Sequence, residues 1–138
     1  MDDKKIVIRR FIANFVSKNR AERSYLELTD VKRRGKFVGR FNHNWESILK
    51  MDFLKRIPKE FDHPQKIQEL LQFRDDEVCY IISHHDDYDD QFFKFKDVFE
   101  KVYARGTATI IVNISASIIF LDTEQIQGPA PRFIGVKK

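Results

Sequence analysis

Residues 78–83 constrain the fold of this chain more than any other segment, because they are apolar at both sets of alternating positions. Val78, Tyr80 and Ile82 would share one face of a strand, and Cys79 and Ile81 would share the other. Successive side chains of a strand point to opposite faces, so this pattern is typical of a strand that is buried on both sides. We therefore expect a central strand with further structure packed against both faces.

More strands are expected on both sides of this segment. The segments Thr107–Ile114 and Ser117–Asp122 are the strongest strand signals, and the polar residues between them mark either a turn or the polar face of one long strand. Arg132–Val136 follows a Gly-Pro-Ala-Pro sequence and can add an edge strand. In the first half, Ser24–Leu28 and Lys36–Phe41 alternate imperfectly and predict two strands joined by a basic loop.

Four segments have apolar residues at helical spacing and end caps that agree with it. Asn44 can cap the second helix and Asp62 or His63 the third, with Pro64 in its first turn, while Asp89 or Asp90 can start the fourth. The four apolar stripes are Ile8, Phe11, Ile12 and Phe15; Trp45, Ile48 and Leu49; Ile67, Leu70 and Leu71; and Phe92, Phe95, Phe99 and Val102.

Runs of neighbouring strands mixed with helices indicate the α+β class, with a mostly antiparallel sheet and helices packed against it. The chain has 138 residues, which suits one domain, and it has no internal repeat and no long linker. We therefore predict a single α+β domain over residues 1–138. The only cysteine excludes an internal disulfide framework. With no long apolar run and no signal-peptide pattern, we expect a cytoplasmic protein that does not contact a membrane.

Charge is unevenly distributed along the chain. Residues 1–60 hold 16 Lys and Arg against 8 Asp and Glu, whereas residues 61–138 hold 9 against 13. The two halves therefore carry +8 and −4, which sum to the net charge of +4. A basic half suggests an acidic partner, either a protein or a nucleic acid. The alternative is that the two halves face each other or that both are simply solvated.

The densest polar cluster, residues 84–90, directly follows the central strand. Its imidazole and carboxylate groups could bind a metal ion, with His84, His85, Asp86 and Asp87 as the candidate ligands. Their spacing matches neither a helical two-histidine site nor a calcium-binding loop. An acidic turn whose Asp residues cap the next helix explains the cluster more simply.

The segment 31–45 interleaves basic and aromatic residues. Cationic side chains contact phosphates and exposed rings stack on bases, so the segment could bind single-stranded nucleic acid. Its rings could equally point into the core, leaving a charged hairpin that protects a sheet edge. The cations are Lys32, Arg33, Arg34, Lys36 and Arg40, and the rings are Phe37, Phe41 and Trp45.

No complete catalytic motif is present. The five glycines satisfy neither phosphate-binding spacing, and Cys79 lies mid-strand, where a thiol is usually an inert core residue. We therefore expect no catalytic residues and no cofactor. The preferred hypothesis is a non-catalytic module, inhibitor-like or adaptor-like, that binds another protein through surfaces of opposite charge. Its predicted contact residues are Lys32, Arg33, Arg34, Lys36, Arg40, Asp86, Asp87, Asp89 and Asp90.

The two alternatives are a metal-dependent hydrolase or nuclease that acts through residues 84–90 and a nucleic-acid-binding protein that acts through residues 31–45.

Overall fold

A six-stranded antiparallel sheet forms the centre of the computed structural model, which describes residues 3–124 and 130–137. The strand order is β1-β6-β5-β4-β2-β3, and every neighbouring pair is antiparallel. The strands are β1 (Leu54–Arg56), β2 (Val78–Ser83), β3 (Gln91–Lys94), β4 (Thr109–Asn113), β5 (Ile118–Asp122) and β6 (Arg132–Val136). The predicted α+β fold with a mostly antiparallel sheet is confirmed.

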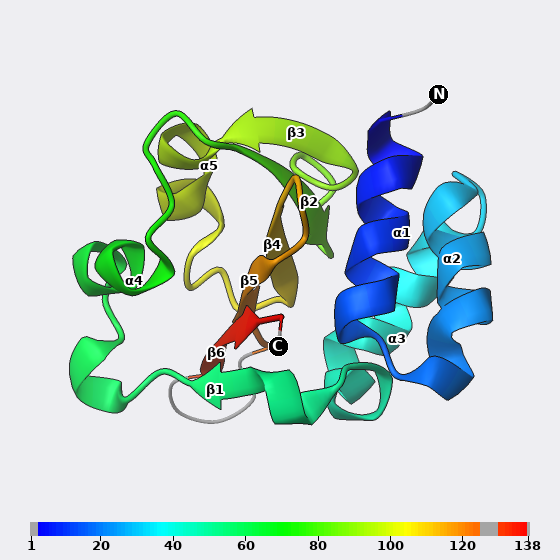
Figure 1. Cartoon of the computed structure of the whole chain (residues 1–138), viewed down its shortest axis with the longest axis horizontal. Helices are drawn as coiled ribbons and strands as arrows, with labels where there is room; N and C mark the ends of the chain where they lie inside the picture. The colour runs from blue at the N-terminus through cyan, green and yellow to red at the C-terminus, as the bar shows by residue number, and fades with distance from the viewer. Residues whose placement is uncertain (1–2, 125–129, 138) are drawn as a thin grey trace.

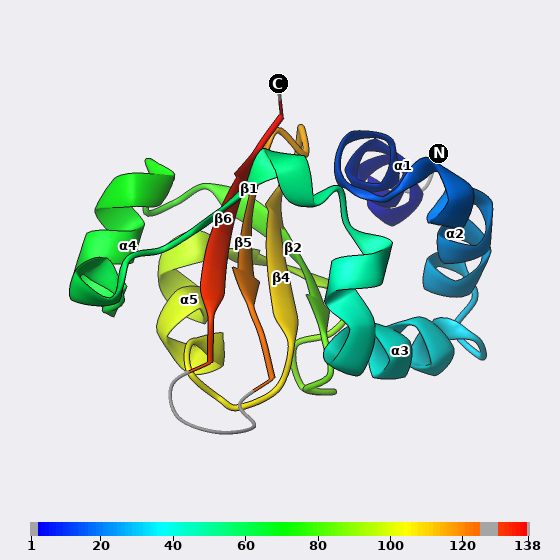
Figure 2. The ribbon, with the colours of Figure 1, turned by 90° about the horizontal axis from the view of Figure 1, so that it is seen from below.

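Helices cover both faces of the sheet (Figures 1 and 2). One face packs against α1 (Asp3–Phe15) and α3 (Arg34–Ile48), with α2 (Ala21–Thr29) packed on these two helices, and the other face packs against α4 (Pro64–Leu71) and α5 (Phe95–Val102). Alternation in β2 follows the prediction, because Tyr80 and Ile82 enter the first core whereas Cys79 and Ile81 enter the second. The remaining helical turns are short 3₁₀ segments at Lys18–Arg20, Met51–Phe53 and Lys59–Phe61.

The first and third predicted helices are confirmed by α1 and α4. The stripe of α1 is buried along its length, with Phe11 and Phe15 fully inaccessible. In α4, His63 occupies the N-cap position and its ring accepts a hydrogen bond from the backbone N–H of Lys66, while Pro64 stands in the first turn. Proline suits this position because its missing N–H would have no partner inside the helix.

The two strands predicted in the first half are wrong, because Ser24–Leu28 lies in α2 and Lys36–Phe41 lies in α3. The helix predicted to begin at Asn44 is the last turn of α3, which kinks at that residue (φ −129°, ψ 33°). Instead of a helix starting at Asp89 or Asp90, the chain forms β3 first and α5 begins at Phe95.

The segment 107–122 forms two strands joined by a turn, so it is not one long strand. The Asn113 side chain makes this turn, accepting hydrogen bonds from the N–H groups of Ser117 and Ile118 at 3.0 and 3.1 Å. The strand Arg132–Val136 exists as predicted but is not at an edge, because β6 lies between β5 and β1. The edge strand β1 has three residues and was not predicted. Among the described residues, no helix combines the length and apolar character that crossing a bilayer requires.

Candidate functional site

Arg34 connects the basic segment, residues 31–45, to the acidic loop, residues 84–90. It is the first residue of α3, and its side chain is only 7% exposed. Its guanidinium donates two hydrogen bonds to the Asp89 carboxylate, from Nε to Oδ2 over 2.6 Å and from Nη2 to Oδ1 over 2.9 Å. Nη1 also donates to the backbone oxygen of Leu28 over 2.9 Å. A two-point pair of this kind fixes orientation as well as distance, so it joins α3 to the loop after β2.

Asp90 extends this network to the first helix. Its Oδ1 accepts a hydrogen bond from the Tyr80 hydroxyl and lies 3.4 Å from Nη1 of Arg34. Its Oδ2 lies 3.7 Å from the ammonium nitrogen of Lys4 in α1. The Arg34 guanidinium also sits over the Tyr80 ring, 5.5 Å from its centre. Residues from α1, α3, β2 and the acidic loop therefore meet in one polar cluster.

The electrostatics of this cluster keep Arg34 charged. Burial alone lowers the pKa of Arg34, but the hydrogen bonds that Arg34 donates to Asp89 and the nearby negative charges outweigh burial, so the pKa is raised. Burial raises the pKa of Tyr80, which holds its hydroxyl protonated as a donor to Asp90. At the centre of the cluster, the charged Arg34 is therefore bound by the carboxylates of Asp89 and Asp90 beside the neutral phenol of Tyr80.

Arg40 is also engaged within the molecule. Its two terminal nitrogens donate to the two carboxylate oxygens of Glu27 in α2, over 2.8 and 2.7 Å. The hydrogen bond from Arg40 is the largest cause that lowers the pKa of Glu27, although burial opposes it. Arg34, Arg40, Asp89 and Asp90, all predicted as partner contacts, thus form ion pairs inside the protein. The alternative that the two halves face each other holds for Arg34, Asp89 and Asp90, whereas Arg40 pairs with a residue of its own half.

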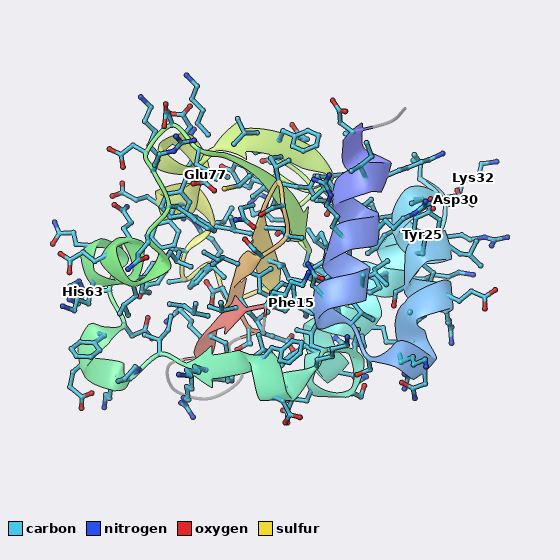
Figure 3. All side chains as sticks on the ribbon, in the orientation of Figure 1. Phe15, Tyr25, Asp30, Lys32, His63 and Glu77 are labelled. Carbon is cyan, nitrogen blue, oxygen red and sulfur yellow. The ribbon has the colours of Figure 1, made fainter. Side chains whose placement is uncertain are left out.

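The other predicted contact residues are exposed, and one of them, Asp86, lines a cleft of about 460 Å³. One wall comes from residues 31–38 and the other from residues 83–90; the lining residues are Val31, Arg34, Gly35, Val38, Ser83, His84, Asp86, Asp89 and Asp90. Three exposed cations, Lys32, Arg33 and Lys36, are sequence neighbours of the first wall. On the second wall Asp86 is exposed, and Asp87 is exposed next to it in the sequence. Lys32 points away from the body of the protein beyond the end of α2 (Figure 3). We call this feature the bipolar cleft.

The four predicted metal ligands are not brought together. His84 is exposed at the cleft, whereas the His85 ring packs against Tyr88, with ring centres 4.9 Å apart. Within the residues that the structure describes, no group of three or more His, Cys, Asp or Glu side chains is arranged to hold a metal ion. The geometry therefore gives the metal-dependent hydrolase hypothesis no support.

The aromatic rings of segment 31–45 are not available for stacking on bases. Phe37 and Phe41 are buried in the first core with their rings stacked 5.8 Å apart. Trp45 is half-buried and packs on Phe133 of β6, with ring centres 5.0 Å apart. What remains of the predicted nucleic-acid surface is its exposed positive charge.

No family model, curated protein or solved structure matches this chain. Its function is therefore inferred from its own residues.

A second polar cluster, which the sequence did not reveal, lies between β5, β6 and the start of α4. Arg132 donates to Asp62 over 2.8 Å, and its Nε lies 2.9 Å from Oδ1 of Asp122, although that contact lacks hydrogen-bond geometry. The Tyr103 hydroxyl donates to Asp62 over 2.7 Å. Asp122 is fully buried, and its Oδ2 accepts the backbone N–H of Ala104 over 2.7 Å.

Burial is the main reason that the pKa of Asp122 is raised to about 6, and the positive charge of Arg132 opposes this increase. Because Asp122 has no exposed surface, a substrate has no direct access to it. This cluster therefore holds the C-terminal strand in place. In the sequence, Asp122 ends one apolar strand and Arg132 begins another. The sequence alone does not show that these two charged residues form a pair.

Proposed function

We propose that this protein is a non-catalytic binding module that recognises another protein through the bipolar cleft. The observation that carries the proposal is the Arg34–Asp89 ion pair. It brings a cationic segment and an anionic loop to the two walls of one cleft while leaving the outer charges of both exposed. Surfaces with both signs of charge in a fixed arrangement favour one partner and reject others, since misplaced like charges repel.

The apolar residues of the cleft support a protein partner. Val31 is 86% exposed, and Val38 also lines the cleft, so a partner side chain can bury apolar surface between the two charged walls. A nucleic acid presents a uniformly negative backbone and would meet the carboxylates of Asp86 and Asp87 at the same cleft. The mixed charge therefore favours a protein surface that carries both basic and acidic side chains.

Affinity capture with matched variants tests the proposal. Asp86→Asn/Asp87→Asn neutralises one wall, Lys32→Gln/Lys36→Gln neutralises the cations beside the other, and Glu100→Gln/Lys101→Gln on the exposed side of α5 is the control. We expect a partner that the native protein and the control capture alike and that both cleft variants lose. Capture of the same proteins in equal amount by all four forms would contradict the proposal.

A further inference from the structure

An apolar groove of about 630 Å³ lies beside the edge strand β1 and shares no lining residue with the bipolar cleft. His63 at the start of α4 and Lys32 near the cleft lie at opposite ends of the molecule (Figure 3). The groove runs between β1, β6 and the 59–70 region, and its apolar lining is Phe53, Ile57, Phe61, Leu70, Ile134 and Val136. Phe61 and Leu70 are each 40% exposed and Val136 is 49% exposed, so large apolar side chains face solvent here.

Positive charge borders this groove. Lys55 and Arg56 line it, and Lys59 lines an adjoining pocket of about 460 Å³ that shares Arg56, Ile57 and Pro58 with the groove. Within the described part of the chain, no carboxylate lies within 4.0 Å of the charged nitrogens of these three exposed cations. The acidic residue on the groove itself is Asp52. The apolar groove thus leads toward three cations that form no ion pair with any carboxylate the structure describes.

We propose that this groove binds a single-chain anionic amphiphile of the fatty-acid class. The aliphatic chain would lie along the apolar lining, and the carboxylate would lie at Arg56 and Lys59, where the groove meets the adjoining pocket. Arg132 also lines that pocket, but its charge is balanced by Asp62 and Asp122. The two exposed cations therefore supply the attraction for the head group.

Size favours a small ligand over a protein. Small-molecule sites span about 300–1,000 Å³ and combine a mainly apolar lining with a few polar anchors, which is the composition found here. A stable protein interface instead needs roughly 800 Å² on each partner, far more than a groove with six apolar side chains offers. This inference is independent of the proposed function, because it uses none of the residues at the bipolar cleft.

Titration calorimetry with dodecanoate below its micelle concentration tests the proposal. We expect saturable 1:1 binding that weakens about three- to fourfold for each methylene removed, from dodecanoate through decanoate to octanoate. Dodecylammonium and dodecyl maltoside, which have the same chain with a positive and a neutral head group, should bind at least tenfold more weakly. Arg56→Gln/Lys59→Gln should reduce dodecanoate binding while leaving dodecyl maltoside binding unchanged.

Two exposed apolar residues provide a matched pair of variants. Leu70→Asp places a charge in the groove and should abolish dodecanoate binding, whereas Leu26→Asp, at a 49% exposed leucine of α2, should not change it. Circular dichroism checks that both variants remain folded. Absent binding, or equal binding by Leu70→Asp and the native protein, would overturn the proposal. So would attachment to phosphatidylglycerol vesicles without 1:1 dodecanoate binding, or a dimer that Leu70→Asp dissociates.

Discussion

Arg34 and Asp89 form a bidentate ion pair across 55 residues of sequence. Their side chains are 7% and 16% exposed, so the pair is largely removed from water. Each residue belongs to a segment whose neighbouring charges remain on the surface. The pair therefore determines where the two walls of the bipolar cleft lie relative to each other.

Asp89→Asn should destabilise the protein by roughly 3 kcal/mol, because it leaves the buried Arg34 charge without its main partner. Asp90 lies 3.4 Å from Arg34 and still partly balances its charge. The loss of stability should therefore be at the low end of the range for breaking a buried ion pair. Urea unfolding followed by circular dichroism measures the effect. Arg33→Gln is the control: its pair with Asp30 is exposed and 3.5 Å long, so the change should stay within about 1 kcal/mol. Equal losses of unfolding free energy for Asp89→Asn and Arg33→Gln would contradict the claim that the buried Arg34 charge depends on Asp89.

Asp122 should make stability fall as the pH rises through 4 to 7. Its pKa in the folded protein is raised to about 6, above the value of about 3.9 in an unfolded chain, so the native state binds the proton more tightly. Relative to Asp122→Asn, which cannot titrate, the native protein should lose on the order of 2–3 kcal/mol of unfolding free energy over this range. Urea titrations of both proteins at four pH values measure the difference. If the unfolding free energy of the native protein, relative to that of Asp122→Asn, stayed constant or increased with pH, the pKa of Asp122 would not be raised in the folded protein.

The apolar patterns of β2, β4, β5 and β6 predicted these four strands, whereas β3, which has no buried residue, was misassigned to the start of a helix. Ser24–Leu28 was misassigned to a strand because a buried charge disrupts the apolar pattern of α2. Glu27 is buried through its pairing with Arg40, while Leu26 is 49% exposed. The buried residues of α2, Ser24, Glu27 and Leu28, have helical spacing, but two of them are polar. The apolar residues alone therefore resembled the alternation of a strand.

The acidic loop was located correctly, but its partners were not predictable. Asp89 and Asp90 were expected to cap a helix, a local role, whereas they bind Arg34 and Tyr80, and Arg34 is 55 residues from Asp89 in the sequence. The following helix consequently begins later, at Phe95. Hydropathy does not encode such long-range ion pairs, and they decide which charges stay exposed.

Gly135 and Gly39 should respond oppositely to alanine. A Cβ at Gly135 in β6 would lie 2.7 Å from atoms of Ile119 and Leu54, so Gly135→Ala should cost about 1–3 kcal/mol through overpacking. A Cβ at Gly39 in α3 meets no atom within 4 Å, so Gly39→Ala should stabilise by about 0.5–1 kcal/mol. Thermal unfolding of the two variants compares them directly, and stabilisation by both would contradict the close approach at β6.

Cys79 should be unreactive in the native protein. It is fully buried, and burial, with a smaller contribution from the charge of Glu77, raises the pKa of its thiol to about 12. Little thiolate forms at pH 8, so labelling by 5,5′-dithiobis(2-nitrobenzoic acid) should be negligible without denaturant and reach one equivalent in urea. Rapid labelling of the folded protein would place Cys79 outside the core.

Site-specific photo-crosslinking tests the binding role of the bipolar cleft most directly. A benzoylphenylalanine is placed at Val31 on one wall, at Asp87 beside the other, and at Lys101 on α5 as a control. If one partner spans the cleft, the first two positions should crosslink to the same protein and the control position should not. Different proteins at positions 31 and 87, or the same protein at all three positions, would contradict recognition through the cleft.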